Sequence, residues 1–316
     1  MLIHRDHAAL PAAARGASVA IGNFDGVHRG HREVIRVAAD HARQLGRPLG
    51  VVTFEPHPGE VLNPADAPPR LTPFRRKAEL LRALGVAHLY VCRFDQSLLA
   101  TPAAAFVAGR LLDGLGVGAI TTGRDFRFGH RRQGDTALLA ELGRAHGIPV
   151  TAVEPVTVAG ALCSSTAIRG ALADGAVEQA NTLLGYAYQL DGIVRPGDRR
   201  GRELGFPTAN VHPLARRPTL PAIGVYAVDA GVWHGSGWRW FPAVAYFGRR
   251  PTFDGRSLLL EVHLLEGGRD LYGQRLRVAF RQRLRGDRGF AGAGELKAQI
   301  ARGCAQARTL FAPILA

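Results

Sequence analysis

Two histidines flank a glycine where a short apolar run meets a helical pattern. His28 and His31 lie on either side of Gly30 in the segment Gly22–His31, which reads GNFDGVHRGH and follows the apolar run Ser18–Ile21. The free backbone N–H groups and the positive dipole end at the start of a helix attract anions. Glycine lets the backbone approach a ligand closely, so the two imidazoles can meet a polyphosphate there. The segment predicts a phosphate-binding loop; incidental surface histidines and a metal pair are the alternatives.

A second group of hydroxyls stands before another helical pattern. The segment Ser164–Arg169 reads SSTAIR, so hydroxyls and N–H groups at a helix start precede an arginine by about one turn. Alone, this pattern is a common helix cap. Together with the histidine loop, it predicts a cradle for the β- and γ-phosphates of a nucleotide. A Walker-type loop is excluded, because neither of the two lysines, Lys77 and Lys297, follows a glycine.

The second half of the chain holds a glycine-rich segment that ends in a Pro-Thr-Ala-Asn block, GDRRGRELGFPTAN over 197–210. Flexible backbone N–H groups in such a loop can fold over phosphates. Thr208 and Asn210 lie two residues apart, so on an extended segment both side chains face one side. A hydroxyl and an amide oxygen are hard ligands that suit Mg²⁺. The segment predicts a magnesium–nucleotide site, with a structural turn as the alternative.

Taken together, these motifs resemble those of the bacterial bifunctional riboflavin kinase/FAD synthetases, over about Ala17 to Leu310. The histidine loop is similar to the phosphate grip of the nucleotidyltransferase superfamily, and the Pro-Thr-Ala-Asn block is the signature of riboflavin kinases. Two further blocks carry the likeness, TFEPHP over 53–58 and GRDFRFG over 123–129. The resemblance implies that the first half transfers AMP from ATP to FMN, and that the second half phosphorylates riboflavin with ATP and Mg²⁺.

The resemblance also implies roles for residues of the first half. ATP is expected to contact Gly22, Phe24, His28, His31, Ser165, Thr166 and Arg169, of which His28, His31 and Arg169 are the expected catalytic residues. The flavin is expected near His57, Phe106, Asp125 and Phe128, with Asp125 at the reacting phosphates. Many family members carry asparagine at position 125, and core packing is the alternative for Phe106 and Phe128.

In the second half, the resemblance assigns ATP binding to Gly197, Gly201, Gly205, Thr208 and Asn210, and Mg²⁺ to the last two. Glu261, in the apolar run LLLEVHL over 258–264, is the expected catalytic base, which takes the proton of the ribityl 5′-hydroxyl. A structural strand glutamate is the alternative. His263, two residues on, is expected to pack rather than to react.

Three positions depart from the family pattern, and all fall in the kinase half. Tyr246 stands where many members have asparagine, Gly267 replaces an aromatic residue, and Gly303 replaces an acidic one. These departures keep a second reading open, a single-activity flavin adenylyltransferase with a weakened kinase module.

The order of apolar runs predicts an α/β protein with two domains. In the first half, apolar runs alternate with helical patterns, which is typical of a parallel, Rossmann-like sheet. The runs are 18–21, 49–54, 88–92, 119–122 and 150–153, and the helical patterns are 32–45, 73–84, 102–112 and 136–145. The second half has closely spaced strand patterns at 188–194, 224–232, 242–247, 258–265 and 276–280, then a helical pattern at 293–311. A small antiparallel barrel with a C-terminal helix is predicted there, with domains at 1–185 and 186–316.

Composition bounds the remaining possibilities. The 316 residues carry a net charge of +14 and contain 3 cysteines, with no Cys-x-x-Cys spacing. A reducing cytoplasmic location is expected, with no membrane span, since no apolar run approaches about 20 residues. The positive net charge suggests a nucleic-acid-binding protein as the non-enzyme alternative. The pairs of adjacent arginines are scattered along the chain, however, so no nucleic-acid partner is expected. The expected partners are riboflavin, FMN and ATP, and the expected state is a monomer or weak homo-oligomer.

Overall fold

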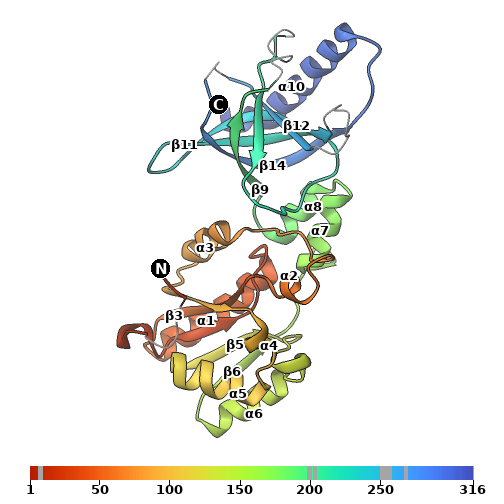
Figure 1. Ribbon diagram of the computed structural model, residues 1–316. Helices are drawn as coiled ribbons and strands as arrows, with labels where there is room; N and C mark the ends of the chain where they lie inside the picture. The colour runs from red at the N-terminus through yellow and green to blue at the C-terminus, as the bar shows by residue number, and fades with distance from the viewer. Residues whose placement is uncertain (6–9, 198–200, 202–204, 250–257, 267–269, 316) are drawn as a thin grey trace. The chain divides into compact units, whose positions relative to one another are not determined.

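The computed structural model describes residues 1–5, 10–197, 201, 205–249, 258–266 and 270–315 (Figure 1). The chain divides into two compact units, Met1–Ser165 and Thr166–Ala316, each of which is described by itself. The predicted boundary at 185/186 follows the change in sequence pattern. In the structure, the two helices that precede residue 186 belong mainly to the second unit. The Asn181 side chain, on the second of these helices, accepts from the Tyr188 amide at 2.7 Å and donates to the Phe280 carbonyl at 2.8 Å.

The first unit contains a six-stranded sheet in the order β1-β4-β3-β2-β5-β6, and every neighbouring pair is parallel. Its strands are β1 (Leu2–His4), β2 (Ser18–Ile21), β3 (Leu49–Glu55), β4 (His88–Arg93), β5 (Ala119–Gly123) and β6 (Val150–Val153). A two-stranded hairpin follows, formed by β7 (Thr157–Val158) and β8 (Ala161–Leu162). The five predicted strands and their parallel arrangement are confirmed. The edge strand β1 was not predicted, because three residues are too few to show a pattern.

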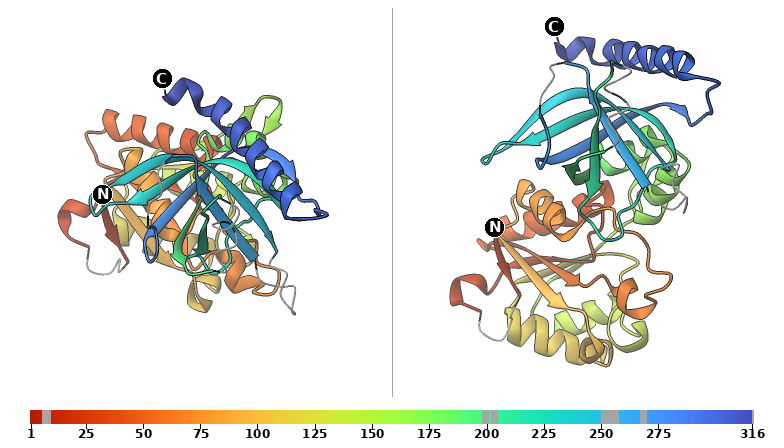
Figure 2. Two further views of the ribbon diagram at one scale, coloured as in Figure 1. Left: turned by 90° about the horizontal axis from the view of Figure 1, so that it is seen from above. Right: turned by 45° about the horizontal axis from the view of Figure 1, so that its top comes forward.

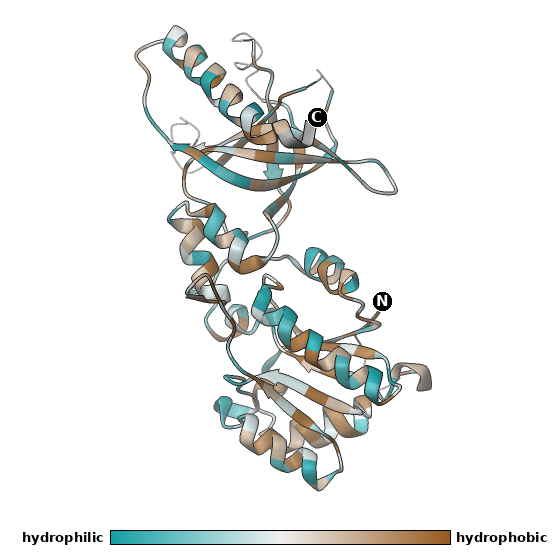
Figure 3. Ribbon diagram, turned by 180° about the vertical axis from the view of Figure 1, so that it is seen from behind, coloured by the Kyte–Doolittle hydropathy of each residue, from teal (hydrophilic) through white to brown (hydrophobic). Residues whose placement is uncertain are grey.

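Helices cover both faces of this sheet. They are η1 (Ala12–Ala14), α1 (Arg29–Gln44), α2 (Pro58–Leu62), α3 (Phe74–Ala83), α4 (Gln96–Leu99), α5 (Ala103–Ala105), the π-helix η2 (Phe106–Leu115), η3 (His130–Arg132) and α6 (Thr136–Ala145). The core on one face joins Val107, Leu111 and Leu115 of η2 to strand residues such as Val19 and Ile120. In Figure 3 the sheet strands are mostly hydrophobic, whereas α1 alternates between hydrophilic and hydrophobic residues.

The order of the strands places a topological switch beside β2. The chain runs from β2 through β3 to β4 on one side and then returns to β5 and β6 on the other side. Loops that leave the carboxyl ends of β2 and β5 therefore diverge, and ligands of open parallel sheets bind in the crevice between such loops. The segment Gly22–His31 follows β2, and the segment that contains Asp125 follows β5.

All of α7 (Ser165–Ala173) except its first residue lies in the second unit, together with α8 (Val177–Leu184). These helices are followed by a closed barrel in the order β10-β13-β12-β11-β14-β9. The strands are β9 (Tyr188–Arg195), β10 (Ala209–Pro213), β11 (Gly224–Trp233), β12 (Trp238–Arg249), β13 (Leu258–Leu264) and β14 (Arg275–Gly286). All neighbouring pairs are antiparallel. The final helix α10 (Ala293–Leu315) runs along the barrel (Figure 2) and buries Cys304, Ala307 and Phe311 against Val225 and Val244. The predicted antiparallel barrel with a C-terminal helix is confirmed.

One helix start differs from its prediction in a way that matters for function. The hydrophobic stripe predicted a helix from Arg32, but α1 begins at Arg29 with His28 as its N-cap. The first turn, which contains Gly30 and His31, is polar and so carries no stripe. The two histidines consequently lie on the helix terminus itself, where the free N–H groups are.

Candidate active sites

The loop after β2 has an unusual backbone. Its first amide, that of Gly22, donates to the Val52 carbonyl at 3.1 Å, which continues the sheet by one residue. Phe24 and Val27 then adopt φ angles of 50° and 39°, and Gly26 adopts 91°. Left-handed backbone at non-glycine residues costs of the order of 1 kcal/mol each and persists where the surroundings hold it in place. Phe24 is 1% exposed, so its ring lies under the loop rather than at the surface.

The two histidines lie face to face at the start of α1. Their ring centroids are 3.6 Å apart with an interplanar angle of 21°. The backbone N–H of His31 donates to Nδ1 of His28 at 3.3 Å, so this bond assigns the proton of a neutral His28 ring to Nε2. Burial, followed by the nearby His28 and Lys77, lowers the pKa of His31 well below 6.5. His31 therefore stays neutral over the ordinary pH range.

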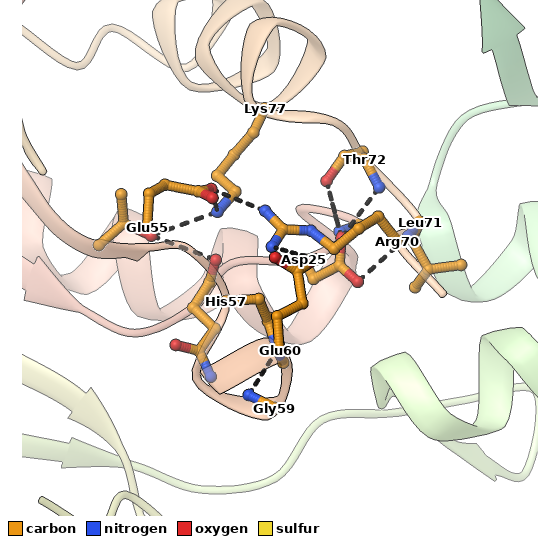
Figure 4. Close-up of polar contacts among 12 residues, drawn as sticks. Asp25, Glu55, His57, Gly59, Glu60, Arg70, Leu71, Thr72 and Lys77 are labelled. Carbon is orange, nitrogen blue, oxygen red and sulfur yellow. Dashed lines mark hydrogen bonds and ion pairs between the residues drawn. The ribbon is translucent and has the colours of Figure 1, made fainter. Parts of the chain in front are cut away.

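Asp25 anchors this loop from within the fold (Figure 4). Its carboxylate is 2% exposed and accepts the backbone N–H groups of Leu71 at 3.1 Å and Thr72 at 2.9 Å. The Thr72 hydroxyl is 3.2 Å from the same carboxylate and accepts the N–H of Gly26 at 2.9 Å. The carboxylate therefore holds the phosphate loop against the segment that precedes α3.

A buried ion cluster lies next to this anchor (Figure 4). One oxygen of Glu55, at the end of β3, is 2.9 Å from the Lys77 ammonium and 2.7 Å from the Arg70 guanidinium. Arg70 is also 3.4 Å from Glu60. Burial alone would raise the pKa of Glu55, but Lys77 and Arg70 hold it below its ordinary value, so the carboxyl group remains ionised.

Sequence analysis missed the importance of Asp25, Glu55 and Lys77. Asp25 lies inside the recognised loop but had no role assigned to it. Lys77 was used only as evidence against a Walker-type loop. It is the single lysine in the arginine-rich first half, and that rarity could have marked it as a residue with a specific role.

Ser165, the first residue of α7, donates its hydroxyl to the Asp25 carbonyl at 2.8 Å. The helix start predicted at this position is therefore confirmed, and Ser165 contacts the phosphate loop. Thr166 lies on the first turn of the same helix, and Arg169 lies one turn on.

The residues expected near the flavin fall into two groups. His57 accepts the Gly59 amide at 3.1 Å and caps α2, while Asp125 is exposed just beyond the carboxyl end of β5. Phe106 and Phe128 are 3% and 6% exposed and belong to the core cluster, with their rings 5.9 Å apart. In this conformation neither ring presents a face to a ligand, as the packing alternative expected.

In the barrel, strand register brings together two of the predicted kinase residues. Asn210 on β10 pairs directly with Glu261 on β13, and Glu261 in turn pairs with Tyr246 on β12. Residues that are directly opposite in an antiparallel pair project to the same face. Asn210 and Glu261 therefore share one face of the barrel wall. The Nδ1–H of His263 donates to the Pro207 carbonyl at 2.9 Å, because a carbonyl oxygen only accepts, and this bond ties down the segment before Thr208.

The glycines of the predicted loop pack against the predicted magnesium ligands. A Cβ on Gly197 would lie 1.9 Å from the amide nitrogen of Asn210, and one on Gly201 would lie 3.0 Å from the Thr208 hydroxyl. Gly201 also accepts the Phe206 amide at 2.8 Å. Gly205 has a φ of 85°, which suits glycine. Residues 198–200 and 202–204 lie outside the described part of the chain.

The departures from the family pattern have different surroundings. The Tyr246 ring lies over Gly248, where a Cβ would be 2.2 Å from its hydroxyl. Burial, followed by Asp287 and Glu261, raises the pKa of Tyr246 to about 12, so the phenol stays protonated beside the kinase residues. A Cβ on Gly303 of α10 would meet open space. Gly267 lies outside the described residues.

Comparison with known proteins agrees with this division. The family model for FAD synthetase matches residues 10–167, and the model for riboflavin kinase matches residues 184–311. A bifunctional riboflavin kinase/FMN adenylyltransferase of Escherichia coli K12 is 42% identical over 98% of this chain and 97% of its own length. The chain belongs to this bifunctional family. The corresponding protein of Pseudomonas fluorescens is also 42% identical, over 95% of this chain and 94% of its own. The chain therefore carries both an FAD synthetase domain and a riboflavin kinase domain.

A solved structure supports the fold over both domains of the chain. It is described as a macrolide-efflux protein from Streptococcus pneumoniae, is 30% identical, and matches 97% of this chain and 98% of its own with a TM-score of 0.87. Within the described residues, no helix is both long and apolar enough to cross a membrane. The two family models point to flavin chemistry rather than to the activity in that description.

Proposed function

We propose that this chain makes FAD from riboflavin in two ATP-dependent steps, each performed by its own set of residues. The kinase domain phosphorylates riboflavin to FMN, and the FAD synthetase domain joins FMN to AMP. The observation that carries the proposal against a single-activity enzyme is the direct pairing of Asn210 with Glu261. That register puts the expected magnesium ligand and the expected base on one face of the barrel wall, which supports a working kinase site despite the departures at Tyr246 and Gly303.

In the adenylylation step, a phosphate oxygen of FMN attacks the α-phosphorus of ATP. A P–O bond forms there as the bond to the α,β-bridging oxygen breaks, and pyrophosphate leaves with that electron pair. The FMN phosphate is already a nucleophile, so no general base is needed. Catalysis rests on positioning and on stabilising the charge of the phosphates.

The phosphate loop suits that task. The Nε2–H of His28, the neutral His31 ring and the N–H groups at the start of α1 would hold the triphosphate, and Gly22 begins the loop. Phe24 supports His31 from below, with ring centroids 5.2 Å apart. Ser165, whose hydroxyl contacts the loop, would add to this grip. The resemblance to the family implies that Thr166 and Arg169 contact the β- and γ-phosphates. Asp125 and His57, which follow β5 and β3, would lie near the flavin, whereas Phe106 and Phe128 would support that region from within the core.

In the kinase step, Glu261 takes the proton of the ribityl 5′-hydroxyl as that oxygen attacks the γ-phosphorus, and ADP leaves. Gly197, Gly201 and Gly205 would let the loop backbone lie over the phosphates. Thr208 and Asn210 fit Mg²⁺, because both offer hard oxygen donors and Gly197 leaves room beside the Asn210 amide. When bound there with ATP, Mg²⁺ would neutralise charge on the phosphates.

Incubation of the purified chain with riboflavin, ATP and Mg²⁺, followed by chromatography, tests the proposal. We expect FMN to appear first and FAD to follow. A chain that forms FAD from added FMN but leaves riboflavin untouched would instead support the single-activity alternative.

The cellular setting is also a proposal. Cys92, Cys163 and Cys304 are buried and form no disulfide bonds, which suits a reducing cytoplasm. We expect a monomer or weak homo-oligomer, which light scattering over a range of concentrations will measure. We also expect no specific nucleic-acid partner, so that any binding to nucleic acid should collapse in rising salt while flavin turnover changes less steeply.

A further inference from the structure

Lys77 is the less expected of the chain's two lysines. Its side chain is completely buried on α3, whereas Lys297 on α10 is exposed. A buried ammonium is costly unless it is paired, and Lys77 is paired with Glu55 at 2.9 Å. Desolvation lowers the pKa of Lys77, while Glu55 acts in the opposite direction.

The hydrogen bonds of Lys77 lead to the phosphate loop (Figure 4). The ammonium donates to the Thr53 hydroxyl at 3.4 Å, and that hydroxyl is 3.2 Å from the Asn23 carbonyl. An ammonium has protons and no lone pair to accept with, so the single Thr53 proton is directed to Asn23. Asn23 precedes the left-handed residue Phe24. One end of the strained loop is therefore fixed through Thr53.

The other connection runs through Glu55 and Arg70. Arg70 shares the Glu55 oxygen with Lys77 and directly precedes Leu71, whose N–H, like that of Thr72, binds the Asp25 carboxylate. Lys77 and Arg70 share one carboxylate oxygen of Glu55, and Arg70 is also 3.4 Å from Glu60, so the two cations and the two carboxylates balance in charge. The loop beside this cluster is the proposed triphosphate site.

We propose that Lys77 is a positioning residue for the adenylylation reaction: it holds the loop Gly22–His31 in its phosphate-binding conformation through Thr53 and through Glu55–Arg70. This inference rests on the proposed role of the loop as the ATP site. Lys77 acts through the loop and does not itself touch the substrates.

The charge of Lys77 also reaches His31. Phe24 packs edge-on against that ring, His28 stacks on its face, and Lys77 acts on it through its charge. Lys77 is one of the causes that lower the pKa of His31. Removal of the ammonium therefore raises the pKa of His31, so that His31 becomes protonated at a higher pH.

Kinetics of the full-length chain test the proposal. Lys77→Met removes the charge but keeps the apolar stem, Lys77→Arg keeps the charge, and Thr53→Val breaks the link to Asn23 while it leaves the ion cluster intact. Lys297→Met is the matched control. FMN adenylylation is measured against ATP concentration and pH, and riboflavin phosphorylation is measured in the same samples. Hydrogen exchange of the β2 and β3 amides reports whether the first unit is folded.

We expect Lys77→Met to raise the KM for ATP in adenylylation by about 10-fold or more, with a smaller change in kcat. The acid limb of its pH profile should move to higher pH, and Lys77→Arg should recover most of the loss. Thr53→Val should be milder and non-additive with Lys77→Met, since both act on one chain of contacts. Lys297→Met and the kinase activity should not change.

Two results would overturn the proposal. One is a folded Lys77→Met chain with wild-type KM and pH profile. The other, which decides the case if Lys77→Met does not fold, is a folded Thr53→Val chain with unchanged adenylylation. His31→Ala, run in parallel, separates these failures from failure of the proposed ATP site: if His31→Ala also leaves adenylylation intact, the loop itself is misassigned.

Discussion

In the first unit, the phosphate loop Gly22–His31 is fixed by groups buried beneath it, the Asp25 carboxylate and the Glu55–Arg70–Lys77 cluster. In the second unit, Asn210 and Glu261 are aligned by the register of two barrel strands, and Gly197 and Gly201 pack against the ligand side chains. The first site therefore depends on buried charge and the second on strand pairing and on space. The two should respond differently to substitution and to pH.

The largest expected effect comes from removing the expected base of the kinase site. Glu261→Gln keeps the size and hydrogen bonding of the side chain but removes the base, so riboflavin phosphorylation should fall by about 10²- to 10⁴-fold. Adenylylation of FMN should not change, because its residues lie in the other unit. The melting temperature is measured alongside both rates. A folded variant with wild-type kinase turnover would falsify the catalytic assignment and leave Glu261 as a strand residue.

Two glycine-to-alanine substitutions, one at each site, test whether the two activities depend on separate close contacts. A Cβ on Gly197 would displace the Asn210 amide, since it would lie 1.9 Å away, so Gly197→Ala should lower kinase kcat/KM by about 10- to 100-fold. On Gly30, a Cβ would be 3.2 Å from the His28 ring and 3.3 Å from the Cys163 carbonyl, so Gly30→Ala should impair adenylylation alone. Gly294→Ala on α10 is the control, because its Cβ meets nothing within 4 Å. Equal effects of Gly197→Ala and Gly30→Ala on both activities would contradict separate sites.

The Asp25 anchor should matter for stability as well as for activity. The Asp25 carboxylate accepts hydrogen bonds from two backbone N–H groups. Asp25→Asn replaces one of its oxygens by an NH₂ group, which cannot accept, so the free energy of unfolding of the first unit should fall by about 1–3 kcal/mol. Protection of the β2 and β3 amides from hydrogen exchange should fall accordingly. The three tryptophans, Trp233, Trp238 and Trp240, all lie in the second unit, so a fluorescence-monitored unfolding curve should barely move. If that curve moves as much as the exchange data, the anchor is not local to the first unit.

Mild acid should weaken the first unit in preference to the second. The pKa of His31 is held well below 6.5 by burial and by His28 and Lys77, so below pH 6.5 the unfolded chain binds a proton that the folded chain does not. Stability of the first unit should then fall with decreasing pH by up to about 1.4 kcal/mol per pH unit. In the second unit, Arg277 and Arg275 outweigh the effect of burial and lower the pKa of Asp191, so its contribution is lost only in stronger acid, below its ordinary 3.8. Exchange data at pH 7.5 and 5.5 measure the difference, and His31→Asn should reduce it.

The sequence predicts most of the fold, because short apolar runs that alternate with helical patterns are typical of the strands of a parallel sheet. Ser18–Ile21 is fully buried, whereas Val150–Val153 forms an edge strand that is only partly buried. It fails where elements are short or polar. Strand β10 is interrupted by His212 and ends at Pro213, and the first turn of α1 has no hydrophobic stripe.

For the sites, the sequence indicates which residues carry chemistry but not what holds them. Asn210 and Glu261 are recognisable by type, yet their direct opposition is a matter of register, which only the folded barrel defines. Lys77 and Glu55 are separated along the chain, and their pairing arises when α3 packs beside β3. A buried ion pair leaves no periodic pattern in the sequence, so the support of the phosphate loop could not be predicted.

The separation of the two activities is tested most directly by a chain in which both loop histidines are replaced. His28→Ala/His31→Ala protein is incubated with riboflavin, ATP and Mg²⁺, and the flavins are separated by chromatography. We predict that FMN accumulates at the wild-type rate and that no FAD forms, whether the reaction starts from riboflavin or from added FMN. Loss of both products from a folded protein, or continued formation of FAD, would contradict two independent sites with the triphosphate held at the start of α1.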